Sequence, residues 1–478
     1  MAGARRAGWR IPCISDGDCK EPTSGMKTHL DWSAYRDAGM GDAYADIPKH
    51  GGDFAKAVAA CINSRICETR GRQVMCPSFQ LSGNPGLSTG GRVRLLKAAL
   101  SSDLVEQALA DPELAEAMDL CLACKGCKRE CEAHVDMALI KAEYLAQRVA
   151  RQGPDLRSRL FAGLPQWLHR HRWLRLLIRW RNRFALVARV AERGLGLSAA
   201  RPLPEPARDP FPGPGRTRHA GRAGMPEVVL LVDTFTRQFE PQIAEAAWAV
   251  LAAGGYGLRV AEATPDAEQP DRPLCCGRTY LAQGFVDEAR AEAARMLAAL
   301  KPHVDAGRVI VGLEASCVLG LRDDAQTLGL DAEMAVVGRA VLMFEEFLAR
   351  ELMARRLEIP LKSAAGQRLL VHGHCHQKAV GAMKAVRRVL RMVPDLEFEM
   401  VDAGCCGMAG TFGIEAEHAA FSVAIAEQAL MPALRAAPDA AVMSNGFSCR
   451  QQMKSQGDHR GRHLASILFQ HLEARGGP

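Results

Sequence analysis

The sequence predicts a multidomain protein in which a small, mainly α-helical N-terminal domain precedes two pseudo-symmetric α/β repeats. The chain has 478 residues, which at about 100–200 residues per domain corresponds to two to four domains. Cysteines interrupt the helical pattern before residue 152. After residue 225, one order of strands, helices and cysteines occurs twice. Strands that alternate with helices indicate an α/β fold.

The composition is that of a globular, cytoplasmic protein. Apolar residues make up 48% of the chain and charged residues 24%, which excludes a disordered or fibrous chain. No apolar run reaches the ~18 residues that a membrane-spanning helix needs. The segment from Met1 to Gly17 contains three arginines without a continuous apolar run behind them, so we predict no secretory signal.

The N-terminal domain is expected over residues 51–152, after an extension over residues 1–50. Helices are predicted at 54–61, 92–119 and 138–151. The cysteines between these helices therefore lie in loops. The chain has sixteen cysteines in all, and a reducing cytoplasm disfavours disulfides. We expect them to be metal ligands or redox-active thiols, apart from the isolated Cys13 and Cys19.

The densest cysteine run is Cys121-x2-Cys124-x2-Cys127-x3-Cys131. This is the spacing of a bacterial ferredoxin run, in which three close thiolates hold one [4Fe-4S] cube and the fourth reaches a second cube. A zinc site would favour two separated cysteine pairs with a long insert. The run therefore favours iron–sulfur clusters over zinc.

A looser partner motif consists of Cys61, Cys67 and Cys76, the last followed by proline. By the same crossing rule, Cys76 should join the first three cysteines of the dense run, and Cys131 should join Cys61 and Cys67. The second cube then lacks one thiolate. Its fourth ligand could be Ser64, another oxygen or nitrogen donor, or nothing, which would give a three-iron cluster or an exchangeable iron. Alternatively, only one cube forms and Cys61 and Cys67 are ordinary buried thiols.

Residues 153–225 form a basic segment and a linker. Between residues 141 and 222 there are 18 Lys and Arg against 5 Asp and Glu. A helical stretch over 155–193, with Trp167, Trp173 and Trp180 among its arginines, is followed by a Pro/Gly-rich linker over 201–225. The stretch could lie on an anionic membrane surface, or it could pack on its own protein or on a partner. It shows no nucleic-acid-binding motif.

The two repeats are expected over residues 226–355 and 366–472. In each, a strand, a helix and a strand precede Cys-Cys-Gly, and a helix, a strand and a further cysteine follow. The first repeat reads 227–233, 241–253, 257–261, Cys275-Cys276-Gly277, 284–300, 308–313 and Cys317. The second reads 368–371, 378–392, 397–401, Cys405-Cys406-Gly407, 415–430, 440–443 and Cys449. These cysteines should converge at the carboxyl ends of the strands, where such folds bind ligands.

Two adjacent thiolates at one turn suit a metal cluster or a redox site. The candidate ligands in this half of the chain are Cys275, Cys276, Cys317, Cys375, Cys405, Cys406 and Cys449. His372, His374 and His376 flank Cys375 at the end of a predicted strand. Alternation would place the three histidines on one face, as ligands, proton relays or merely hydrogen-bonded neighbours.

Several motifs resemble the iron–sulfur half of FAD-linked 2-hydroxyacid oxidoreductases. Similar proteins are the glycolate oxidase iron–sulfur subunit and that of anaerobic glycerol-3-phosphate dehydrogenase. The resemblance spans residues 45–470, with two departures: the family usually has arginine at Gly90 and proline at Glu132. The motifs are Met75-Cys76-Pro77-Ser78-Phe79, Leu87-Ser88-Thr89-Gly90-Gly91-Arg92 and Cys121-Leu122-Ala123-Cys124-Lys125-Gly126-Cys127-Lys128.

The repeats resemble the cysteine-rich CCG domain of heterodisulfide reductase and related subunits, whose fuller pattern is Cys, Cys-Cys-Gly and Cys-x2-Cys. The second repeat has Gly446 in place of the first cysteine of the closing pair. The first repeat has Glu314 at that position and Asp233-Thr234-Phe235 in place of the leading cysteine. The resemblance implies a further metal or iron–sulfur site, with the second repeat as the better candidate.

The chain contains no flavin-binding Gly-x-Gly-x-x-Gly between a strand and a helix, and no Walker loop. Its chemistry should therefore come from cofactors. We expect no catalytic residue here, but one or two [4Fe-4S] clusters that accept electrons from FAD on a partner flavoprotein dehydrogenase acting on glycolate, D-lactate or D-2-hydroxyglutarate. The acceptor could be a quinone, reached peripherally at the inner face of the membrane. Alternatively, the double-cysteine site itself acts as a thiol–disulfide oxidoreductase, and a structural zinc protein is a third hypothesis.

Overall fold

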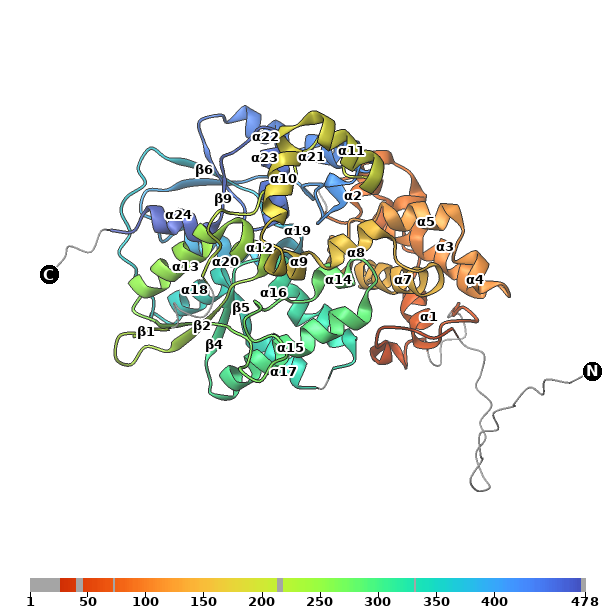
Figure 1. Cartoon of the computed structure of the whole chain (residues 1–478), viewed down its shortest axis with the longest axis horizontal. Coiled ribbons are helices and arrows are strands. Elements are labelled where there is room, and N and C mark those ends of the chain that lie inside the picture. The colour runs from red at the N-terminus through yellow and green to blue at the C-terminus, as the bar shows by residue number, and fades with distance from the viewer. Residues whose placement is uncertain (1–25, 40–45, 72–73, 213–217, 331, 474–478) are drawn as a thin grey trace, which may run out of the picture.

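The structure is a computed structural model that describes residues 26–39, 46–71, 74–212, 218–330 and 332–473 (Figure 1). Cys13 and Cys19 lie outside these residues. The N-terminal helices occupy one end of the molecule in Figure 1, and the two sheets with their helices occupy the other. None of the described helices is both long and apolar enough to cross a membrane.

The N-terminal region is helical around the cysteine loops. Its core contains Phe54, Leu96, Met118 and Tyr144, all at most 2% exposed. The predicted helix over 92–119 is in fact three helices, because the Asp111 side chain caps a new helix whose first residue is a proline. The elements are η1 (Ser33–Tyr35), α1 (Gly52–Ala59), η2 (Ile66–Glu68), α2 (Pro77–Ser82), η3 (Pro85–Leu87), α3 (Thr89–Ser101), α4 (Val105–Ala108), α5 (Pro112–Asp119), α6 (Gly126–Glu130) and α7 (Met137–Gln152).

The basic segment consists of four short helices, not one long one. They are α8 (Leu156–Ala162), α9 (Leu164–Arg170), α10 (Leu174–Arg183) and α11 (Ala185–Leu195). A proline in the first turn of α9 removes a helix donor and restarts the helix there. The linker that follows is packed against the protein, since the buried Arg201 guanidinium donates to the Ser422 hydroxyl and the Gln452 amide oxygen.

The first α/β unit contains a five-stranded sheet in the order β1-β3-β2-β4-β5. All its pairs are parallel except that of β1 with β3. The strands are β1 (Arg218–His219), β2 (Glu227–Leu231), β3 (Gly257–Val260), β4 (Val309–Gly312) and β5 (Val341–Met343). The other elements are α12 (Thr234–Phe239), α13 (Pro241–Ala253), α14 (Arg278–Leu281), α15 (Val286–Asp305), α16 (Ala315–Arg322), η4 (Asp324–Leu328), α17 (Glu333–Ala340) and α18 (Phe344–Met353).

The second α/β unit contains a four-stranded parallel sheet in the order β7-β6-β8-β9. The predicted helix over 415–430 is interrupted, because Ala429 leaves helical geometry before the next helix. The strands are β6 (Arg368–Val371), β7 (Glu397–Met400), β8 (Ala441–Met443) and β9 (Gly461–Arg462). The other elements are α19 (Cys375–Ala379), α20 (Met383–Leu390), η5 (Phe412–Ile414), α21 (Ala419–Glu427), α22 (Leu430–Ala436), α23 (Phe447–Ser455) and α24 (Leu464–Gln470).

One apolar core joins the two α/β units. Helix α13 packs on α24, and α18 packs on α20, so that each pair combines one helix from each unit. Buried side chains of both sheets, such as Leu258 and Leu369, belong to the same core. The carboxyl ends of the strands in the two units are therefore held in a fixed relation to each other.

Candidate metal centres

Four cysteines of the N-terminal region gather at the start of α2 and α6. Burial raises the pKa of Cys127, and Asp136 and the thiols of Cys76 and Cys121 raise it further. Burial also raises the pKa of Cys124, with contributions from Cys127 and Cys121. Each thiol is thus within electrostatic range of others in the set. The structure brings together the four residues that the crossing rule assigns to one cube.

Backbone donors point at these sulfurs. The Thr89 N–H donates to Cys76 Sγ at 3.0 Å, and the Thr89 hydroxyl lies 3.0 Å from the same sulfur. The next residue of α3, Gly90, donates its N–H to Cys67 Sγ at 3.2 Å. Burial raises the pKa of Cys76 to about 11, so a thiolate here needs a cation or such donors. A helix N-terminus supplies them, because its free N–H groups favour negative charge.

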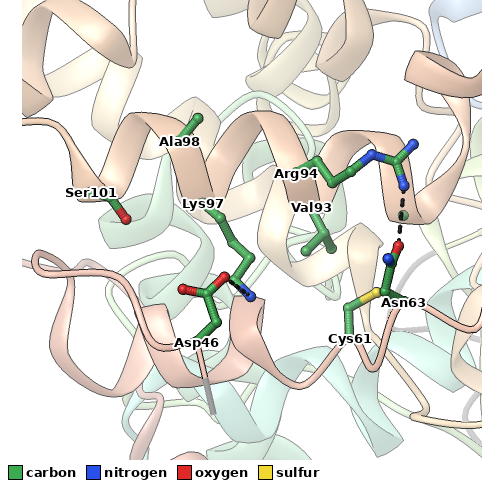
Figure 2. Close-up of a pocket in the computed structure, with 9 residues that line it drawn as sticks. Asp46, Cys61, Asn63, Val93, Arg94, Lys97, Ala98 and Ser101 are labelled. Atoms are coloured by element: carbon green, nitrogen blue, oxygen red, sulfur yellow. Dashed lines mark hydrogen bonds and ion pairs between the residues drawn. The ribbon is translucent and has the colours of Figure 1, made fainter. Parts of the chain in front are cut away.

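The second set consists of Cys61, Cys67 and Cys131. Burial raises the pKa of Cys61, and the Cys131 and Cys67 thiols raise it further. Ser64, a candidate fourth ligand, is exposed. A cavity of about 390 Å³ adjoins Cys61 and is lined by Asn63, Gly90, Val93, Arg94, Lys97 and neighbouring residues (Figure 2).

A charged cluster holds the first cysteine set against the first α/β unit. The buried Lys125 ammonium donates to the carboxylates of Asp323 and Asp324 and lies 3.6 Å from Asp136. Asp324 also accepts from the Arg278 guanidinium at 2.5 Å. Such a buried network fixes orientation, because removing one member would leave the others unpaired in a low-dielectric environment. Sequence reasoning missed this cluster.

In the first α/β unit, three thiols lie in a chain of contacts. The neighbouring Cys276 thiol and burial raise the pKa of Cys275, and the Cys317 thiol is among the groups that raise the pKa of Cys276. Glu314 and Asp233, which replace cysteines of the fuller pattern, cap helices α16 and α12 with their side chains. Burial raises the pKa of Glu314 to about 7. Both carboxyl groups thus already accept hydrogen bonds from backbone N–H groups of the described chain.

In the second α/β unit, four thiols are connected. The hydrogen bond with Cys405, followed by burial, raises the pKa of Cys375. The Cys406 thiol is among the groups that raise the pKa of Cys405, and the Cys449 thiol is among those that raise the pKa of Cys406. The two units build their double-cysteine turns alike: Gly277 and Gly407 have φ of 76° and 88°. A Cβ at either glycine would lie within 2.7 Å of a carbonyl oxygen, that of Ala289 in α15 or of Ser422 in α21, so glycine is required there.

The histidine prediction is wrong in its geometry. Strand β6 ends at Val371, and a helix begins at Cys375, so His372, His374 and His376 do not alternate along a strand. His374 caps α19 by accepting the His376 N–H at 3.2 Å. Burial lowers the pKa of His374 to about 3, so this imidazole is neutral at pH 7.

A cavity of about 380 Å³ lies where the three regions meet. Its lining includes Cys121, both double cysteines, His374 and His376, and helices α8 to α10 contribute Phe161, Leu164 and Ile178. Phe235 and Phe447 stack on one wall with ring centroids 5.1 Å apart. The cysteine-rich sites of both α/β units therefore share one cavity.

The first cysteine set lies within electrostatic range of the second double-cysteine site. The Cys375 thiol is among the groups that raise the pKa of Cys124, and the Cys124 thiol is among those that raise the pKa of Cys405. Leu122 belongs to the same small apolar cluster as Cys405, and His376 Nε2 lies 3.1 Å from the Ala123 carbonyl oxygen. Thiol groups that can act as metal ligands thus form a series that extends from the N-terminal domain into the second α/β unit.

Two family models match the chain in these regions. A 4Fe-4S dicluster domain matches residues 57–135, and a cysteine-rich domain matches residues 369–454. The gathered thiols and the N–H donors around them fit iron–sulfur clusters, which bind to cysteine thiolates. The chain is therefore an iron–sulfur protein that combines a dicluster domain with a cysteine-rich domain.

Curated relatives agree with this class. The chain is 24% identical over 375 residues to D-2-hydroxyglutarate dehydrogenase of Escherichia coli K12, covering 75% of this chain and 34% of the relative. It is 26% identical over 251 residues to a subunit of the anaerobic glycerol-3-phosphate dehydrogenase of the same organism, covering 52% and 59%. Lactate utilization protein A of Lysinibacillus sphaericus is 25% identical over 157 residues, covering 31% and 65%.

The chain thus spans between about a third and about two thirds of the length of these relatives. The matches confirm the predicted resemblance to the iron–sulfur portion of FAD-linked oxidoreductases.

Proposed function

We propose that this chain transfers electrons from a reduced flavin on a partner dehydrogenase, through two iron–sulfur clusters and a cysteine-rich metal site, to a downstream acceptor. The observation that supports the proposal best is the position of Cys124, whose thiol is within electrostatic range of Cys375 and Cys405. Clusters bound at these thiols would be neighbours. When bound, they would supply the one-electron chemistry that the chain's own side chains cannot.

In the proposed order, electrons enter at the second cysteine set. Cys61 is only partly buried and lies beside a cavity at the surface, whereas Cys124 and Cys127 are buried between domains. The second set therefore faces a partner, and the first set faces the α/β units. The relatives that are dehydrogenases by name extend well beyond this chain, so we assign the flavin and the 2-hydroxyacid substrate to a part outside it.

We assign the acceptor to the cavity between the α/β units. Its phenylalanine wall suits an apolar ring, and the thiols of both units lie on its lining. A quinone has this chemistry. We treat the two units as related repeats, which is supported by the equivalent strand orders β3-β2-β4-β5 and β7-β6-β8-β9 and by the equivalent glycine turns.

The cluster content tests the proposal directly. Protein purified or reconstituted without oxygen should contain roughly eight irons in the dicluster domain, with matching acid-labile sulfide. Dithionite should produce the electron paramagnetic resonance spectrum of two interacting reduced clusters. A colourless protein with zinc and no sulfide would contradict electron transfer.

The helical pair α10–α11 is proposed as the membrane contact. Large apolar side chains are exposed on it, including Trp173, Leu176, Trp180, Leu186 and Val190, which are 54–73% exposed. Between residues 167 and 195 the chain has eight arginines and one acidic residue. Exposed indoles and aliphatic groups among arginines fit the interface of an anionic bilayer. Ile178, which also belongs to α10, lines the acceptor cavity.

A double variant in which serine replaces both Leu176 and Trp180 should bind anionic phospholipid vesicles about tenfold or more weakly. Burying each large apolar side chain contributes about 1.5–3 kcal/mol, and about 1.4 kcal/mol corresponds to tenfold. Vesicle flotation measures the bound fraction. The control replaces Val336 and Met353, exposed apolar residues of the first α/β unit, and should leave binding unchanged. Equal binding of both double variants would place the contact elsewhere.

A further inference from the structure

The loop with Cys61 and Cys67 has the same backbone pattern as the loop with Cys121, Cys124 and Cys127. An offset of 60 residues superimposes Cys61 on Cys121 and Cys67 on Cys127. At that offset, the position of Cys124 is taken by Ser64. The first loop is thus Cys-x2-Ser-x2-Cys where the second is Cys-x2-Cys-x2-Cys.

The backbone conformations support this equivalence independently of the spacing. Asn63 has φ of 56° and its counterpart Ala123 has 47°, while Arg65 and its counterpart Lys125 both have 58°. A positive φ is uncommon for residues other than glycine and costs free energy unless the surroundings impose it. In each loop, one such residue comes directly before the central Ser64 or Cys124 and one comes directly after it. The two loops thus share one backbone pattern, which indicates that they have the same function.

The two central residues differ in their surroundings. Cys124 is 7% exposed and faces the second α/β unit, whereas Ser64 is exposed. Beside the Ser64 loop lies the 390 Å³ cavity, in which Cys61 is the one cysteine among the described lining residues (Figure 2). The cavity reaches Cys61 and Asn63, the residue before Ser64, so solvent has a route to this side of the second set.

Gly90 keeps this side free of side chains. A Cβ at Gly90 would lie 3.3 Å from Cys67 Sγ and 3.4 Å from Arg94 Nη1, so a larger residue would occupy the space next to the thiol. The nearby cations are already paired: Arg94 donates to Glu68 Oε1 at 2.8 Å and to Asn63 Oδ1 at 3.4 Å. Lys97 pairs with Asp46 at 2.7 Å, as Figure 2 shows.

We propose that the cluster held by Cys61, Cys67 and Cys131 has one iron without a cysteine ligand, at the position of Ser64, and that this iron exchanges with solvent through the cavity beside Cys61. The inference rests on the proposed function, since it requires that clusters bind. It assigns to this chain one cluster with four cysteine ligands and one with three. The ligand class at the exchangeable iron is a small oxygen donor from solvent, and the exchanging species is Fe²⁺.

Oxidation by ferricyanide tests the inference. Ferricyanide takes one electron from a [4Fe-4S]²⁺ cluster and becomes ferrocyanide, and the [4Fe-4S]³⁺ product loses Fe²⁺ to leave [3Fe-4S]⁺. The full-length, cluster-loaded protein should release about one of its roughly eight irons and show the resonance signal of a three-iron cluster. Dithionite with ⁵⁷Fe²⁺ should then restore the iron, visible by Mössbauer spectroscopy at one site.

Two variants make the test specific. Ser64→Cys should suppress iron release, because it completes the cysteine set. Ser101→Cys, which adds a thiol elsewhere on the lining of the same cavity, should release iron like the wild type.

The outcomes separate two kinds of failure. A protein that binds no iron or sulfide at the outset refutes the proposed function itself. A protein that binds about eight irons but releases none refutes only the exchangeable iron. Equal iron release by the wild type and Ser64→Cys, or suppression by Ser101→Cys, refutes the assignment to position 64.

Discussion

Replacing Cys124 with alanine should halve the iron of the dicluster domain, from roughly eight to roughly four atoms, and should abolish the magnetic interaction between the two reduced clusters. Cys124 is buried, so solvent does not supply a replacement ligand beside Cys76, Cys121 and Cys127. In the complex with its flavoprotein, acceptor reduction should fall at least about 100-fold. Changes to residues that only support a metal ligand already cost 10–100-fold.

The matched control is Cys317→Ala, which removes a buried thiol from the first α/β unit. This variant should keep the interacting pair of reduced clusters. Iron analysis and electron paramagnetic resonance on both variants measure the effect without the partner. If the interaction signal persisted in Cys124→Ala, the first cluster would have to be held by other ligands.

Replacing Lys125 with methionine should lower the free energy of unfolding by about 3–5 kcal/mol, the usual cost of removing one partner from a buried ion pair. The side chain of Lys125 is 6% exposed and lies between Asp324, Asp136 and Asp323. Burial alone would lower its pKa, but these carboxylates raise the pKa above its ordinary value. The variant would leave the carboxylates of Asp136 and Asp324, whose side chains are at most 8% exposed, without this cation.

Lys128 provides the control for this prediction. It pairs with Asp136 and Asp323, but its side chain is 43% exposed, and exposed pairs contribute about 0–1 kcal/mol. Lys128→Met should therefore cost about 1 kcal/mol or less. Urea unfolding of the cluster-loaded proteins without oxygen measures both values. Similar midpoints for the two variants would show that the buried cluster does not hold the domains together.

Part of this architecture follows from local sequence. The predicted segments 241–253 and 368–371 coincide with α13 and β6, because both have a clear apolar pattern and turn residues at their ends. Other predicted helices are longer than the helices in the structure. The predicted helix over 155–193 is in fact broken at a proline and at short turns. The apolar pattern of the sequence continues across these breaks and does not indicate them.

The contacts between domains could not be predicted in this way. Lys125 stands within the dense cysteine run. No residue near it in the sequence indicates that its side chain pairs with Asp323 and Asp324. Likewise, residues 372–376 continue the polarity of a strand end, but the cap at His374 starts a helix. Such features depend on tertiary packing, which local periodicity does not contain.

The crossed grouping of the cysteines has a consequence for how the molecule is made. In the proposed arrangement, Cys76 joins a cluster with residues far downstream, while Cys131 joins one with residues far upstream. The loop closed by the first cluster, residues 76–127, would then lie within the loop closed by the second, residues 61–131. Cluster insertion would then be part of the folding of the N-terminal domain, and a cell short of either iron or sulfide would accumulate chains in which this domain is incompletely folded.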